Sequence, residues 1–112
     1  MNPLKIKAKT GPERKIQDAI IDFLLIRGWY VLQTHGSMYQ SGFPDLYATH
    51  SKYGARWIEV KNPLAYHFTP AQLECFPKMS ANGTRIWILT AATESEYQKL
   101  FGPANWYTYL KL

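Results

Sequence analysis

Two acidic residues and a lysine are spaced so that they could bind a divalent metal ion. Glu59 and Lys61 lie two residues apart in a strand-forming run, so their side chains share one face of a strand. A hairpin that turns near Lys52 would place Asp45 roughly opposite Glu59, with side-chain carbons about 5 Å apart. Two carboxylates this close repel each other unless a cation lies between them, and hard oxygen ligands suit Mg²⁺ or Mn²⁺. The spacing therefore predicts a metal site with Asp45 and Glu59 as ligands, the main-chain carbonyl of Val60 as a further ligand, and Lys61 as a fixed positive charge.

A plainer interpretation of the same residues is an exposed hairpin with a surface charge pair. Glu59 and Lys61 taken alone favour this interpretation. However, the run from Trp57 to Lys61 is apolar around its charges, which is typical of an inner strand, where charges need partners or a task. Asp45 in turn follows the tight loop Gly42-Phe43-Pro44 and begins a strand. This context favours a functional site.

The elements that would position these residues follow from turn residues and periodicity. Thr10 is expected to cap a helix that ends at Gly28. Thr69 is expected to cap a second helix with Gln72 as its capping-box partner, and Pro77 to kink or shorten that helix. Strands are predicted over residues 29–34, 45–50, 55–61, 84–90 and 105–112, and a short third helix over residues 93–101. The predicted order is α-β-β-β-α-β, followed by an extra α and β.

Length and composition favour a single folded domain over residues 1–112, with residues 1–10 as a flexible basic tail. Hydrophobic residues make up 46% and charged residues 19% of the 112, which is typical of a globule and not of a disordered chain. No apolar run could cross a bilayer, no signal peptide is evident, and the single cysteine, Cys75, cannot form an internal disulfide. We therefore expect a soluble, cytoplasmic protein with no membrane partner and no small-molecule organic cofactor.

The charge balance favours an acidic partner. The net charge is +5 and the pI about 9.4, which is common among nucleic-acid-binding proteins. The alternating residues Lys5, Lys7 and Lys9 could form an arm that touches phosphate, or merely a solvated tail. His35 and His67 flank the motif strands and could touch DNA, but the favoured interpretation is that they are merely polar loop residues. The histidines lack zinc spacing, and no phosphate-binding glycine loop appears.

The motif residues together resemble a known family. The series Gly42-x-Pro44-Asp45-Leu46, followed by Glu59-Val60-Lys61, resembles the PD-(D/E)XK nuclease superfamily, and more closely its virus-type replication-repair nuclease (VRR-NUC) domain. The acidic residue in the first helix of that family is matched by Glu13, and its glutamine early in the helix after the motif strand by Gln72. The resemblance covers roughly residues 13–89, so residues 91–112 lie outside it.

The resemblance implies a restriction-endonuclease-like core with a central mixed sheet flanked by helices. Asp45, Glu59 and the Val60 carbonyl would bind Mg²⁺ or Mn²⁺. Lys61 would orient the attacking water or offset charge in the transition state, and is not expected to be the base. Glu13 would ligate the ion directly, through water or at a second ion.

Two of these residues also have structural interpretations. Glu13 could be the capping-box partner of Thr10, although it lies in line with Ile16 on the inward face of its helix. Gln72 could equally be only the partner of Thr69.

The resemblance implies a metal-dependent DNA endonuclease that acts on branched DNA, such as four-way junctions. It also implies a homodimer with a role in DNA repair. The expected source is bacterial or phage. The aromatic tail over residues 106–110 adds to the expectation of a homodimer, because a strand there would leave an edge that must be covered or paired. The tail could also pack on its own sheet. The alternatives are a non-catalytic nucleic-acid-binding module on the same fold, and a structural or interaction protein.

Overall fold

A four-stranded mixed sheet forms the centre of the protein. The computed structural model describes residues 11–34 and 41–110. The sheet order is β1-β2-β3-β4, in which β1, β2 and β3 are antiparallel and β4 runs parallel to β3. In chain order the elements are α1 (Gly11–Ile26), β1 (Tyr30–Gln33), β2 (Leu46–His50), β3 (Gly54–Val60), α2 (Pro70–Ala81), β4 (Ile86–Leu89), α3 (Glu94–Gln98) and the 3₁₀ helices η1 (Lys99–Phe101) and η2 (Trp106–Tyr109). The predicted order α-β-β-β-α-β is confirmed.

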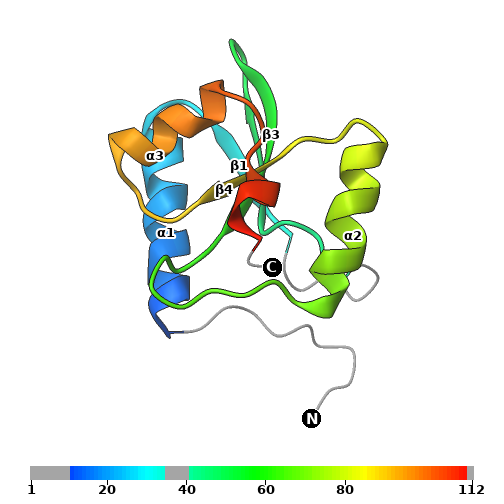
Figure 1. Cartoon of the computed structure of the whole chain (residues 1–112). Coiled ribbons are helices and arrows are strands. Elements are labelled where there is room, and N and C mark those ends of the chain that lie inside the picture. The colour runs from blue at the N-terminus through cyan, green and yellow to red at the C-terminus, as the bar shows by residue number, and fades with distance from the viewer. Residues whose placement is uncertain (1–10, 35–40, 111–112) are drawn as a thin grey trace, which may run out of the picture.

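Helices cover both faces of this sheet. α1 and α3 lie on one side and α2 on the other (Figure 1). Among the helices of the described ranges, none combines the length and the apolar character needed to span a membrane.

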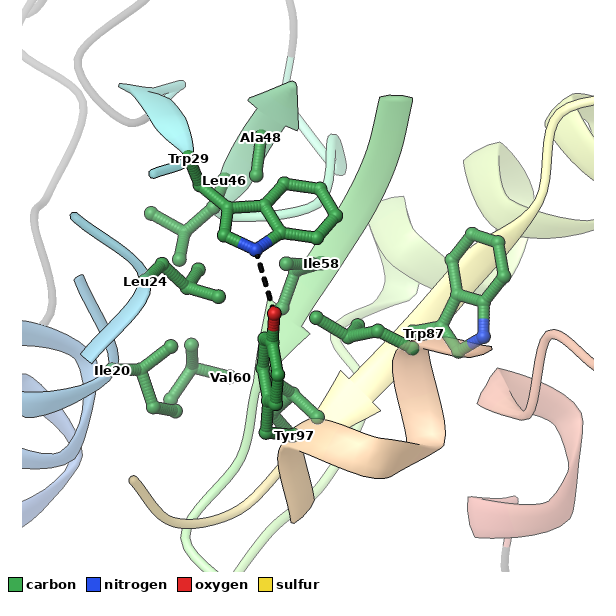
Figure 2. Packing of buried hydrophobic residues seen from close by; sticks show 11 residues of the cluster. Ile20, Leu24, Trp29, Leu46, Ala48, Ile58, Val60, Trp87 and Tyr97 are labelled. Carbon is green, nitrogen blue, oxygen red and sulfur yellow. Dashed lines mark hydrogen bonds between the residues drawn. The ribbon is translucent and has the colours of Figure 1, made fainter. Parts of the chain in front are cut away.

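The larger apolar cluster fills the space between the sheet and α1. Ile20 and Leu24 of α1 point toward the strands, and Trp29 donates a hydrogen bond from Nε1 to the hydroxyl of Tyr97, 3.1 Å away (Figure 2). The buried members of the cluster are Ile20, Leu24, Trp29, Leu46, Ala48, Ile58, Val60, Trp87, Leu89, Tyr97 and Leu100. Because Ile58 and Val60 of β3 face this cluster, the intervening Glu59 must point to the α2 side.

α2 covers the other face through a smaller cluster of Phe76, Ile86, Ile88 and Trp106. The helix continues through Pro77 to Ala81, so the expectation that this proline shortens it is wrong. Proline removes the hydrogen bond to the carbonyl of Leu73, but both residues are exposed and water can bind that carbonyl. The helix ends as predicted at Asn82-Gly83, where Gly83 has a φ of 91°.

The strand expected over residues 105–112 is wrong, because the chain forms η2 there. The side chain of Asn105 accepts a hydrogen bond at Oδ1 from the Ile88 amide of β4, 2.7 Å away, where a further strand would otherwise pair. The Thr108 hydroxyl donates to the Asn105 carbonyl at 2.7 Å, which favours a local turn. Trp106 is buried in the cluster beneath α2. The aromatic tail therefore packs on its own sheet, and it no longer supports a dimer.

Glu96 joins α3 to the end of β4. Its carboxylate accepts hydrogen bonds from the Thr90 amide and hydroxyl at 2.8 and 2.9 Å and pairs with Lys99. Lys99 also donates to the hydroxyl of Tyr109 at 2.9 Å, which links α3 to η2. Burial by itself would raise the pKa of Glu96, but the hydrogen bonds from Lys99 and Thr90 outweigh it and hold that pKa below its ordinary value.

The first prediction concerns this contact. Glu96→Gln should lower the free energy of unfolding by about 1–2 kcal/mol at pH 7, because hydrogen bonds to a charged acceptor are lost. Since the folded pKa lies below the unfolded one, the carboxylate stabilises the protein above the unfolded value and loses this effect as pH falls through the folded value. Urea unfolding at neutral and acid pH, with the exposed Glu74→Gln as control, measures this. A difference from wild type that persists undiminished in acid would contradict it.

Candidate active site

The two candidate acidic ligands meet where the pairing of β2 with β3 ends. Leu46 pairs with Ile58 in the antiparallel ladder, so Asp45 lies beside Glu59. The Asp45 amide donates to Glu59 Oε1 at 3.1 Å, and the Val60 amide donates to Asp45 Oδ2 at 2.8 Å. These two reciprocal hydrogen bonds take the place of the main-chain hydrogen bonds that would continue the β2–β3 ladder, and they fix the positions of both carboxylates. The predicted placement of Asp45 opposite Glu59 is confirmed.

Both carboxylates are buried. Asp45 is 7% exposed and Glu59 is 0% exposed. Glu59 lies in β3, which has β2 on one side and β4 on the other. The interpretation as an exposed hairpin with a surface charge pair is therefore wrong. Buried carboxylates need charged or hydrogen-bonding partners to remain ionised.

Lys61 supplies one such partner. Its ammonium nitrogen lies 3.1 Å from Glu59 Oε2 and donates to the His67 carbonyl at 2.8 Å and to Gln72 Oε1 at 3.1 Å. It also lies 4.7 Å from the centre of the Phe68 ring. An ammonium has three N–H donors, and these three acceptors fix its position beside the carboxylates.

Gln72 contacts both the capping residue Thr69 and the carboxylate cluster. The side-chain oxygen Oε1 of Gln72 accepts a hydrogen bond from the main-chain amide of Thr69 at 3.1 Å. The main-chain amide of Gln72 donates to Thr69 Oγ1, which completes the capping box of α2. The same side chain donates from Nε2 to Glu59 Oε2 at 2.8 Å and accepts from Lys61. The start of α2 is thereby joined directly to the carboxylate cluster.

A second prediction separates these two roles of Gln72. Thr69→Ala removes only the cap and should lower the free energy of unfolding by about 1 kcal/mol. Gln72→Ala also leaves Glu59 and Lys61 each short of a buried partner, so the loss should be at least about twice as large. Denaturant unfolding of both variants gives the difference. Equal losses would mean that Gln72 contributes only the cap.

The loop before Asp45 is held against α2 and β1. Gly42 has a φ of 86°, and a side chain there would meet the Ala71 carbonyl at 2.5 Å, so only glycine permits this approach. On the other side, the Thr34 amide donates to the Asp45 carbonyl at 2.9 Å and the Thr34 hydroxyl donates to the Pro44 carbonyl. The contacts with Ala71 and Thr34 therefore fix the main chain on which Asp45 lies.

Among the candidates that the structure describes, Glu13 does not form a metal-binding group with the two carboxylates. Glu13 is half-buried on α1, and the described residues form no group of three or more His, Cys, Asp or Glu side chains that could hold a metal ion. Direct ligation alongside Asp45 and Glu59 is therefore not seen, which leaves a role through water or at a second ion. The ring of His67 is exposed. The predicted nucleic-acid contacts Lys5, Lys7, Lys9 and His35 lie outside the described residues.

Sequence reasoning missed one buried polar residue of α1. Gln17 is fully buried, its Nε2 lies 3.4 Å from Gln33 Oε1, and its Oε1 has no hydrogen-bond partner within the described part of the chain. It follows Glu13 by one helical turn and precedes Ile20 on the inward face, so the helical period could have identified it.

The single cysteine has no sign of a nucleophile. Cys75 is half-buried beside the Phe76 cluster, and burial raises the pKa of its thiol. A raised pKa disfavours the reactive thiolate.

The donor atoms of the cluster fit a hard divalent cation. Asp45 and Glu59 contribute carboxylate oxygens, and Val60 contributes a main-chain carbonyl between the side chains of Glu59 and Lys61. Such all-oxygen sets suit Mg²⁺ and Mn²⁺. Lys61 and Gln72 both bind Oε2 of Glu59, whereas Oε1 is the oxygen on the Asp45 side.

Comparisons with known proteins identify the fold. No family model matches the chain, and no curated protein matches it. A solved structure described as "VRR_NUC domain" matches with a TM-score of 0.61 and 18% sequence identity, over 80% of this chain and 96% of that chain. The chain therefore has the VRR-NUC fold, a restriction-endonuclease-like fold, as the motif residues predicted.

Proposed function

We propose that this chain is a metal-dependent deoxyribonuclease that hydrolyses phosphodiester bonds. The observation that carries the proposal is the buried cluster in which Asp45, Glu59, Lys61 and Gln72 contact one another at the end of the β2–β3 ladder. A structural role alone gives no reason to place two carboxylates and a lysine in the interior, because apolar residues would pack there at no desolvation cost.

The metal would be held by the oxygen donors of this cluster. Asp45, Glu59 and the Val60 carbonyl would be its ligands, with Glu13 acting through water or at a second ion. When bound, Mg²⁺ or Mn²⁺ supplies Lewis-acid polarisation of the phosphate and lowers the pKa of a bound water.

The protein's own residues position the reacting groups. Lys61 would hold the attacking water or a phosphate oxygen by its positive charge, and its bonds to His67 and Gln72 keep that charge fixed. Gln72 holds Oε2 of Glu59 and so leaves Oε1 turned toward Asp45. The packing of Phe68 over Lys61 shields this end of the cluster from bulk water.

Cleavage of defined DNA by purified protein tests the proposal. Linear, flapped and four-way DNA, and an RNA strand of the same sequence, are incubated with Mg²⁺, with Mn²⁺ or with EDTA. Metal-dependent cleavage of DNA is expected. DNA binding without cleavage under every metal condition would favour the non-catalytic binding module, and neither binding nor cleavage would favour a structural protein.

Preference for branched DNA and assembly as a homodimer are further parts of the proposal, and they rest on the likeness to the VRR-NUC domain. Two copies related by a two-fold axis would present two sites to one branched molecule. Light scattering at micromolar concentration should give a dimer mass, and four-way DNA should be cut faster than linear DNA. A monomer that cuts both substrates equally would contradict both parts.

A further inference from the structure

A cleft lies at the edge of the sheet next to the candidate active site. β3 begins at Gly54, but β4 pairs with it only from Trp57 onward, where Trp57 meets Ile86. Within residues 11–34 and 41–110, no strand therefore covers the first residues of β3 on this side, and a cavity of about 380 Å³ remains there. This volume falls within the range of small-ligand sites.

One wall of the cleft is aromatic and continues into the carboxylate cluster. Tyr47 and Trp57 line it, with ring centres 4.5 Å apart, and both rings are partly exposed. Tyr47 follows Asp45 by two residues and Trp57 precedes Glu59 by two, so all four side chains share one sheet face. Residues two apart on a strand are separated by about 7 Å. The aromatic wall is thus the immediate neighbour of the proposed cleavage site.

The opposite rim carries positive charge without acidic partners. Arg85 is exposed, and its side chain makes no hydrogen bond or ion pair with any residue in the described ranges. Arg56 donates only to main-chain carbonyls, those of Leu100, Tyr53 and Ala55 at 2.8, 3.0 and 2.9 Å, and none of its described partners is a carboxylate. Two guanidinium groups that no carboxylate of the described residues neutralises suit a phosphate.

We infer that this cleft binds an unpaired nucleotide of the substrate strand, next to the phosphate that is cut. The base contacts Tyr47 and Trp57, and its phosphate is bound by Arg85 with Arg56 behind it. Aromatic faces accept any base but need it out of a duplex, so the cleft selects strands with an unpaired segment beside the cleavage point. The inference rests on the proposed function, because it concerns the strand that enters the Asp45–Glu59 site.

The test uses a flapped DNA with 2-aminopurine at an unpaired position next to the branch, in EDTA so that no cleavage occurs. The wild type should quench 2-aminopurine fluorescence on binding. Tyr47→Ser should remove the quenching and weaken binding about tenfold. Arg85→Gln should weaken binding about fivefold and reduce the slope of log K against log salt by about 0.7–0.9.

Matched controls remove the same kinds of side chain elsewhere. Tyr107→Ser removes an exposed tyrosine of η2 and Lys78→Gln an exposed cation of α2, and both should behave as wild type. If Tyr47→Ser lowers thermal stability, Tyr47→Leu replaces it in the same measurements, because leucine keeps the apolar packing and still lacks the aromatic ring.

Comparing these readouts with cleavage separates the two proposals. Tyr47 and Arg85 variants that bind and quench as the controls do would overturn this inference. Wild-type quenching without cleavage in Mg²⁺ or Mn²⁺ would overturn the nuclease proposal and leave the nucleotide cleft standing.

Discussion

Replacing Glu59 by glutamine, or Asp45 by asparagine, should abolish DNA cleavage while the protein remains folded. Each substitution keeps the size of the side chain and removes one negative charge from the proposed oxygen ligand set. Removing a residue that merely supports a metal ligand lowers affinity or activity by about 10- to 100-fold. Loss of a ligand itself should exceed about 100-fold.

Single-turnover cleavage in Mg²⁺ measures this effect, and binding of the same DNA in EDTA should survive in both variants. The control is Glu74→Gln, which removes a carboxylate of the same type from the exposed side of α2 and should leave cleavage unchanged. Thermal unfolding should show folded proteins. Full activity of both site variants would end the mechanism proposed above.

The centre of the site was predictable because strand geometry is regular. Residues two apart on a strand share a face, and the turn around residues 51–54 fixes the register, so the position of Asp45 beside Glu59 follows from counting. The capping box at Thr69 and Gln72 was predictable for the same reason, since it depends only on local spacing. Sequence could not show that Gln72 reaches Glu59 and Lys61, because that contact depends on how α2 packs against β3.

What the sequence could not supply depends on competition between partners far apart in the chain. Residues 105–112 have the composition of a strand, yet the Asn105 side chain takes the Ile88 amide and Trp106 is buried under α2, so a 3₁₀ helix forms. The cleft at Arg85 likewise arises from the offset between the starts of β3 and β4, which no local pattern encodes. Local patterns therefore identified the carboxylate pair, whereas tertiary packing determines its surroundings.

Removing the charge of Lys61 should slow turnover far more than it weakens metal binding. Lys61 contacts Oε2 of Glu59, whereas Oε1 is the oxygen on the Asp45 side. Lys61 is therefore not one of the proposed metal ligands. A fixed charge at a reacting centre is commonly worth about 3 kcal/mol, so Lys61→Ala should reduce the single-turnover rate by about 100-fold or more. The Mn²⁺ affinity, measured by calorimetry, should change much less.

Stability must be followed in parallel, because Lys61 is also a buried partner of Glu59. Removing the cationic partner of that carboxylate should lower the free energy of unfolding by about 3 kcal/mol in the absence of metal. Lys61→Arg is the informative companion. It keeps the charge, but its planar guanidinium cannot offer three donors from one atom to Glu59, His67 and Gln72. The arginine variant should therefore recover much of the stability but little of the rate. An alanine variant that is destabilised yet turns over at the wild-type rate would show that Lys61 serves only to neutralise Glu59.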